Sequence, residues 1–246
     1  MIAARALPGL PEVRPGDDLG ALLAAAAARL DDGGLRSGDV LAVAHKVVSK
    51  AEGRVVRLAD VTPGARARAL AAEHGRDPRQ VEVVLGETAE LVRAERGRLI
   101  CRTRHGFVCA NAGVDASNAG APETLVLLPE DPDASARRLR AALGAAVVIT
   151  DSFGRAWRNG QCEVAIGCAG LAPLDDWRGR PDSGGRELHV TVIAVADEAA
   201  AAADLVRDKV SREPAVRLRG LERHVLDGDG PGAAALVRPR AEDLFG

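Results

Sequence analysis

Two aspartates stand in small polar segments that leave room for a metal ion or a phosphate. Asp115 lies in the run Asn-Ala-Gly-Val-Asp-Ala-Ser-Asn at residues 111–118, and Asp151 and Ser152 directly follow a continuous apolar run. Two carboxylates and a hydroxyl are hard oxygen donors of the kind that bind Mg²⁺, with waters and phosphates completing its shell. Asp115, Asp151 and Ser152 are therefore candidate metal ligands. The alternative that each aspartate only forms an Asx-turn at the end of a strand stays open.

Cationic residues near these segments are suited to an anionic substrate. Lysine is scarce in this chain, so Lys50 is a candidate phosphate contact, with a solvated surface lysine as the alternative. Arg155 and Arg158 follow the second aspartate closely, and guanidinium groups bind phosphates or carboxylates in a bidentate manner. We take Lys50, Arg155 and Arg158 as candidate catalytic residues. Together with a metal ion, they predict phosphoryl chemistry on an anionic substrate.

The composition argues against several other classes of protein. The net charge is −2 and aromatic residues make up 2% of the chain, which disfavours binding to nucleic acid. The sequence has no P-loop and no strand-linked Gly-x-Gly-x-x-Gly motif. None of the four cysteines forms a Cys-x-x-Cys pair, so we expect buried, reduced thiols. We see no signal peptide and no membrane span, and we expect a cytoplasmic protein.

Alternating strands and helices must position the candidate residues. Apolar runs predict strands at residues 39–44, 54–58, 99–103, 124–128, 145–150, 188–196 and 215–218. Capping residues and periodicity predict helices at residues 19–30, 63–74, 78–85, 131–143 and 197–206. Residues 45–53 are predicted to form a polar turn, and residues 188–196 carry the strongest strand pattern. The alternation predicts an α/β (mixed α+β) fold, with residues 1–246 as a single domain and residues 228–246 as a tail or junction.

Short stretches spread over nearly the whole chain occur together in the order known from one family. They lie at residues 9–13, 15–19, 38–41, 48–54, 104–107, 111–118, 128–133, 150–155, 165–167 and 195–198. Each stretch alone is a weak signal, but the ordered set is specific. Over roughly residues 8–221, the chain resembles the coenzyme F420-0:γ-glutamyl ligase family.

The resemblance implies a GTP-dependent ligase and a set of site residues. Such an enzyme joins L-glutamate to F420-0 and extends a γ-linked tail through an acyl phosphate, releasing GDP and phosphate. The family implies an intertwined homodimer with two Mg²⁺ or Mn²⁺ ions per site, and K⁺ as a further ion. Asp115, Asp151 and Ser152 match its metal ligands, and Asp208 is our choice for the last ligand of the second metal. Its GTP-contacting positions match Leu10, Pro11, Glu12, Val13, His45, Lys46, Lys50 and Asn118.

The resemblance leaves two other functions open. One is a metal-dependent GTP hydrolase or phosphotransferase that acts on another small acid. The other is a non-catalytic nucleotide-binding partner of a reductase. Residues 236–245 also resemble the junction that precedes a nitroreductase-like flavin domain in two-domain relatives. The chain is accordingly expected to be either a free-standing ligase or a domain of a longer protein.

Overall fold

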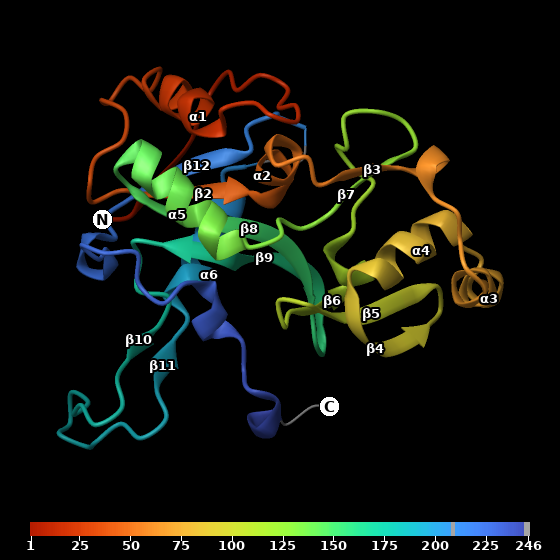
Figure 1. Ribbon diagram of the computed structural model, residues 1–246. Helices are drawn as coiled ribbons and strands as arrows, with labels where there is room; N and C mark the ends of the chain where they lie inside the picture. The colour runs from red at the N-terminus through yellow and green to blue at the C-terminus, as the bar shows by residue number, and fades with distance from the viewer. Residues whose placement is uncertain (208–209, 244–246) are drawn as a thin grey trace.

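The computed structural model describes residues 1–207 and 210–243, and its centre is a five-stranded sheet (Figure 1). The strands, in spatial order, are β1 (Ala3–Ala6), β12 (Ala215–Arg219), β2 (Val40–Ala44), β8 (Ala146–Arg155) and β9 (Arg158–Ala169). The pair β2–β8 is parallel and every other pair is antiparallel. The expectation of a mixed α/β fold is confirmed.

Helices cover both faces of this sheet because its central strands are apolar on both sides. Leu41 and Val43 of β2 pack in one cluster with α1 (Leu19–Ala27) and α5 (Pro132–Leu143). Their neighbours on the strand pack in a second cluster with α6 (Val195–Asp204) on the opposite face. Alternate residues of a strand point to opposite faces, so a strand buried on both sides has a continuous apolar sequence.

A second, smaller lobe has its own hydrophobic cluster (Figure 1). It contains the following elements: α3 (Ala65–His74), α4 (Pro78–Gly86), β4 (Thr88–Glu95), β5 (Arg98–Thr103) and β6 (Val108–Ala110). The pair β3 (Val55–Arg57) and β7 (Thr124–Val126) carries the chain into this lobe and back out of it. The loop that leaves β6 toward β7 therefore returns to the central sheet, and this loop carries Asp115.

Most predicted elements are present with small shifts at their ends. Asp18 caps α1 by accepting a hydrogen bond of 2.9 Å from the Ala21 backbone N–H, as the sequence predicted. Gly144 ends α5 in the left-handed conformation, which suits glycine because it has no Cβ. In the part of the chain that the structure describes, no helix combines the length and the apolar character needed to cross a membrane.

Three predictions of local structure were wrong. Residues 188–196 form no long strand: only β11 (Val192–Ile193) pairs, with β10 (Asp175–Asp176), and α6 already begins at Val195. Strand propensity is realised only where a sheet offers a partner, and Val190 is instead exposed. Residues 45–53 begin with a helix, α2 (His45–Ala51), that starts directly after β2.

The third error concerns the segment around Asp151. The sequence suggested a turn, but this residue lies within β8, which continues to Arg155 and pairs with β9. The strand β9 was not predicted at all. Its first half is polar and only its second half is apolar, so it has no uniform strand pattern.

Candidate functional site

An open pocket of about 1150 Å³ lies where the parallel pairing of β2 and β8 ends. The last residue of β2, Ala44, stands beside Thr150 of β8, so the start of α2 meets Asp151 and Ser152 of β8 at this edge. Ligands in α/β sheets commonly bind at the carboxyl ends of parallel strands. The loop at residues 115–122, the N-terminal residues 10–13 and the segment after α6 complete the wall.

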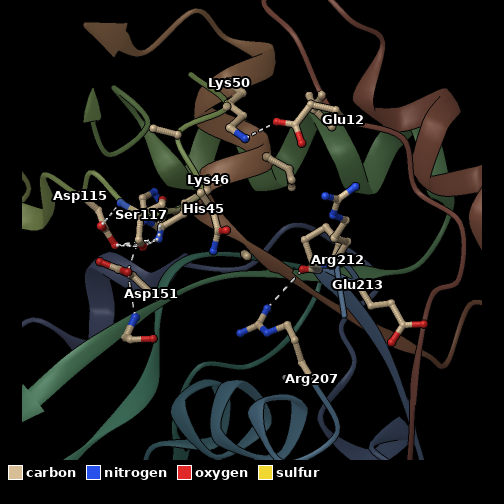
Figure 2. A pocket seen from close by; sticks show the side chains of 18 of the residues that line it. Glu12, His45, Lys46, Lys50, Asp115, Ser117, Asp151, Arg207, Arg212 and Glu213 are labelled. Atoms are coloured by element: carbon tan, nitrogen blue, oxygen red, sulfur yellow. Dashed lines mark hydrogen bonds and ion pairs between the residues drawn. The ribbon is translucent and has the colours of Figure 1, made fainter. Parts of the chain in front are cut away.

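The first turn of α2 brings His45 and Lys46 to the pocket (Figure 2). The His45 ring is buried: its Nδ1 lies 3.3 Å from Ser49 Oγ and its Nε2 lies 3.3 Å from Asp151 Oδ1. The contact to Asp151 is short enough for attraction but is not an aligned hydrogen bond. The histidine therefore lies in contact with Asp151, one of the predicted metal ligands.

Asp115 forms an Asx-turn and also an ion pair with Lys46. Its Oδ1 accepts a hydrogen bond of 2.6 Å from the Ser117 backbone N–H, which is the turn that we considered as the alternative. Its Oδ2 lies 2.7 Å from Lys46 Nζ. Burial raises the pKa of Asp115, but the Lys46 ammonium and the Ser117 donors outweigh burial, and the pKa lies below its ordinary value of 3.8. The carboxylate is thus ionised and oriented toward positive charge.

Asp151 and Ser152 lie at the same edge of the pocket, on β8. Asp151 Oδ1 accepts a hydrogen bond of 2.8 Å from the Ser152 backbone N–H. The Ser152 hydroxyl donates a hydrogen bond of 2.5 Å to Glu163 Oε1 on the neighbouring strand β9. This hydrogen bond fixes the direction in which the Ser152 hydroxyl group points, because a serine hydroxyl has a single donor hydrogen.

The carboxylate and hydroxyl oxygens at this edge suit a divalent cation that keeps most of its waters. Within residues 1–207 and 210–243, no group of three or more His, Cys, Asp and Glu side chains is arranged to hold a metal ion. Mg²⁺ in phosphate-transfer sites uses one or two carboxylates and takes its other ligands from waters and phosphates. Asp115, Asp151 and Ser152 fit that pattern. Asp208 lies outside the described residues.

Lys50 reaches the pocket from the last turn of α2. It is 7% exposed, and its Nζ lies 2.5 Å from Glu12 Oε1 (Figure 2). The Glu12 side chain is largely exposed, so it can return to solvent when an entering anion takes its place beside Lys50. Lys50 is therefore not a solvated surface lysine, and it directs its ammonium at the pocket wall.

The structure brings nearly all of the predicted site residues together. The predicted metal ligands and nucleotide contacts that line this one pocket are Leu10, Pro11, Glu12, Val13, His45, Lys46, Lys50, Asp115, Asn118, Asp151 and Ser152. Arg155 and Arg158 do not line it. They face each other at the tip of the β8–β9 hairpin, where Arg155 Nη2 donates to the Asn159 carbonyl at 2.7 Å.

Three further residues in the pocket were not predicted. Glu163 and Arg207 form a buried ion pair of 2.7 Å, and Arg212 lines the wall with a left-handed φ of +59°. The strand β9 would have indicated Glu163, because a hairpin from Ser152 places these two residues opposite each other. The family resemblance placed residues 207–213 near the nucleotide, but it singled out Asp208 and not Arg207 or Arg212.

None of the four cysteines is among the residues that line the pocket. Cys101, Cys109 and Cys168 are free and buried, as expected, and Cys162 is free and half-buried. Burial is the main cause that raises the pKa of Cys109 and of Cys168 to about 12. These two thiols are therefore protonated at neutral pH.

Comparisons with known proteins agree with this geometry. Residues 9–220 match the family model described as F420-0:Gamma-glutamyl ligase. The chain is 46% identical over 242 residues to a protein of Methanopyrus kandleri named Coenzyme F420:L-glutamate ligase, covering 95% of this chain and 93% of the relative. A protein of Methanothermobacter thermautotrophicus with the same name is 44% identical over 246 residues, covering 96% of each chain. A third, from Natronomonas pharaonis, is 46% identical over 248 residues, covering 98% of this chain and 93% of the relative.

Proposed function

This chain belongs to the F420-0:γ-glutamyl ligase family, and from that premise we propose that it joins L-glutamate to coenzyme F420-0 with GTP as the energy source. One observation carries the proposal. The residues that the family resemblance assigns to metal and nucleotide come from four separate parts of the chain, and they line a single pocket. Such convergence at the carboxyl ends of parallel strands favours a shared site.

Asp115, Asp151 and Ser152 would hold the divalent metal ions, Mg²⁺ or Mn²⁺. Lys46 Nζ, 2.7 Å from Asp115 Oδ2, supports this role because that oxygen already accommodates a positive charge. When bound, the metal supplies neutralisation of phosphate charge. His45 Nε2 contacts Asp151 Oδ1 and so restricts the movement of the Asp151 side chain. These side chains therefore define the phosphate end of the proposed nucleotide site.

Lys50 would bind a phosphate of GTP. Its ammonium is buried at the base of the pocket and its present partner, Glu12, is exposed on the pocket side. A phosphate that enters the pocket can replace Glu12 without unpairing Lys50. The same side chain would then compensate negative charge that develops while the γ-phosphoryl group is transferred.

The proposed reaction has two steps. A terminal carboxylate oxygen of F420-0 attacks the γ-phosphorus of GTP, the bond to the bridging oxygen breaks, and GDP leaves. The amine of L-glutamate then attacks the acyl carbon, phosphate leaves, and the amine loses a proton. Repeating both steps would extend the γ-linked tail. Lys50 serves the first step, in which charge moves between phosphates.

Several features of the proposal reach beyond the pocket residues. We propose the homodimer, K⁺ as a further ion, and a nitroreductase-like flavin domain or protein as a partner on the basis of the family resemblance alone. Arg155 and Arg158 are proposed to bind an anionic group of F420-0 or glutamate. Because they lie at the tip of the β8–β9 hairpin, outside this pocket, that role requires a substrate or a second chain to reach the tip.

Mass spectrometry of the products tests the function. The protein is incubated with F420-0, GTP, Mn²⁺ and L-glutamate, and each component is omitted in turn. We expect F420-0 to gain one or more glutamate residues only in the complete mixture, with one GDP released per glutamate added. Release of GDP that does not depend on F420-0 and glutamate would instead indicate a GTP hydrolase.

A further inference from the structure

Glu163 lies in the pocket but is not among the residues to which a role has been assigned. It lies on β9 directly opposite Ser152 of β8, it lines the pocket, and it is 5% exposed. A carboxylate this deeply buried is retained only where its charge is compensated by close partners. Its two oxygen atoms identify those partners.

Both oxygens of Glu163 are occupied within the protein. Oε1 accepts the Ser152 hydroxyl at 2.5 Å, and Oε2 lies 2.7 Å from Arg207 Nη2. The side chains of Glu163 and Arg207 are both more than nine-tenths buried. Glu163 is therefore held by two side chains of the protein, one on each oxygen, beside two of the proposed metal ligands.

Arg207 extends the same network to the other side of Asp151. Its Nη2 lies 3.2 Å from Thr150 Oγ1, and its Nη1 donates to the Pro214 carbonyl at 3.2 Å (Figure 2 shows Arg207 below the pocket). Thr150 and Ser152 are the two chain neighbours of Asp151. The network thus fixes the strand on both sides of a proposed metal ligand and attaches it to the chain that follows α6.

We propose that Glu163 is a positioning residue that acts through Ser152 and Arg207 to orient the metal-binding edge of β8. By accepting the Ser152 hydrogen, Glu163 fixes the direction of that hydroxyl group and so orients its oxygen at the edge of the pocket. Removing a group that hydrogen-bonds to a metal ligand and orients it typically lowers metal affinity about 10- to 100-fold. This inference rests on the proposed function, because it assumes that Ser152 binds a metal ion.

The test measures Mn²⁺ affinity at equilibrium for the full chain and three variants: Glu163→Gln, Ser152→Ala and the double variant. We expect Glu163→Gln to weaken Mn²⁺ binding about 10- to 100-fold. Since Glu163 acts largely through Ser152, the double variant should bind little more weakly than Ser152→Ala alone. When one residue acts through another, the effects of replacing each of them on Mn²⁺ affinity do not add up. A general loss of stability would instead make Glu163→Gln lower the affinity equally in the wild type and in Ser152→Ala.

Asp39→Asn is the matched control. Asp39 is also a buried carboxylate paired with an arginine, but it lies at the other end of β2, away from the pocket. We expect it to keep the Mn²⁺ affinity of the wild type. If Glu163→Gln fails to fold, the variant that also carries Arg207→Met removes both charges of the pair and provides the same comparison.

The outcomes separate this inference from the proposed function. Wild-type Mn²⁺ affinity in Glu163→Gln, or additive effects of Glu163→Gln and Ser152→Ala, would overturn the positioning role while the ligase proposal stands. A wild-type protein that neither binds Mn²⁺ nor forms glutamylated product would overturn both. A higher KM for the GTP–Mn²⁺ complex, with kcat restored at saturation, would support the positioning role.

Discussion

The two ends of the parallel pair β2–β8 lie beside carboxylates in opposite situations. At the amino end, Asp39 is 1% exposed and binds Arg219 through both oxygens at 2.8 Å. At the carboxyl end, Asp115 and Asp151 each contact one basic side chain and border an open pocket. One end is closed by its own ion pairs, whereas the other leaves oxygen atoms accessible to a ligand.

This difference separates the carboxylates at the two ends better than their pKa values do. Burial raises the pKa of both Asp39 and Asp115, and in both cases the neighbouring cation and backbone donors outweigh burial, so that both pKa values lie below 3.8. The direction of the shift is therefore the same at both ends. What differs is whether the carboxylate oxygens are already saturated by arginine.

Replacing Asp115 should have the largest effect on activity. We expect Asp115→Asn to lower kcat by about 100-fold or more, because a metal ion contributes several kcal/mol to stabilising transferred phosphate. The melting temperature should change little, since the residue lies at the pocket and not in a hydrophobic cluster. Steady-state kinetics at saturating Mn²⁺ and thermal unfolding measure both quantities. Full activity in this variant would remove Asp115 from the metal site.

Replacing Lys50 should affect nucleotide binding more than the reaction of the F420-0 carboxylate. A hydrogen bond to a charged group contributes about 1.5–3 kcal/mol, so we expect Lys50→Met to weaken GTP binding about 10- to 100-fold. Titration with GTP measures this affinity. Arg138→Met is a suitable control because Arg138 pairs with Glu52 outside the pocket. Unchanged GTP affinity in Lys50→Met would exclude the proposed phosphate contact.

Replacing Arg155 or Arg158 tests whether substrate contacts extend beyond the pocket to the tip of the β8–β9 hairpin. Exposed ionic contacts contribute about 0.2–1 kcal/mol, so we expect Arg155→Gln and Arg158→Gln to raise the KM of F420-0 or of glutamate by about two- to fivefold. The KM of GTP should stay constant because neither residue lines the pocket. Kinetics with each substrate varied in turn separate these constants. A change confined to GTP would place these arginines near the nucleotide instead.

Replacing Asp39 should affect stability and leave catalysis intact. The folded-state pKa of Asp39 lies below its ordinary value of 3.8, so its contribution is present above pH 3.8 and is lost as the pH falls through the folded pKa. We therefore expect Asp39→Asn to unfold more easily than the wild type at neutral pH and the difference to shrink in acid. Urea unfolding at several pH values measures this. Loss of turnover in a folded variant would contradict the comparison.

The sequence was informative where chemistry and burial leave a local pattern. The continuous apolar runs at residues 39–44 and 145–150 predicted the central parallel pair, because strands covered on both faces have no polar alternation. Two small polar segments, one at residues 111–118 and one directly after the second apolar run, indicated Asp115 and Asp151 as candidate site residues. The helix α2 was missed because seven residues are too few to show helical periodicity.

Features that depend on contacts between distant parts of the chain were not predictable in this way. Glu163 becomes meaningful only through the β8–β9 register, and Arg207 only through its contact with β9. The strand pattern at residues 188–196 failed for the converse reason, since most of that run has no partner strand. Local sequence therefore indicated the pocket residues that we propose as metal ligands but not Glu163 and Arg207 beside them.

Equilibrium binding of Mn²⁺ to the wild type, Asp115→Asn and Asp39→Asn tests the central claim most directly. The contrast between the two ends of β2–β8 predicts equal affinity in the wild type and Asp39→Asn. It predicts that affinity falls by at least about 10-fold in Asp115→Asn, because a ligand and not a structural ion pair is lost. Equal Mn²⁺ affinity in all three proteins, or an equal loss in both variants, would contradict a metal site at the carboxyl end of the sheet.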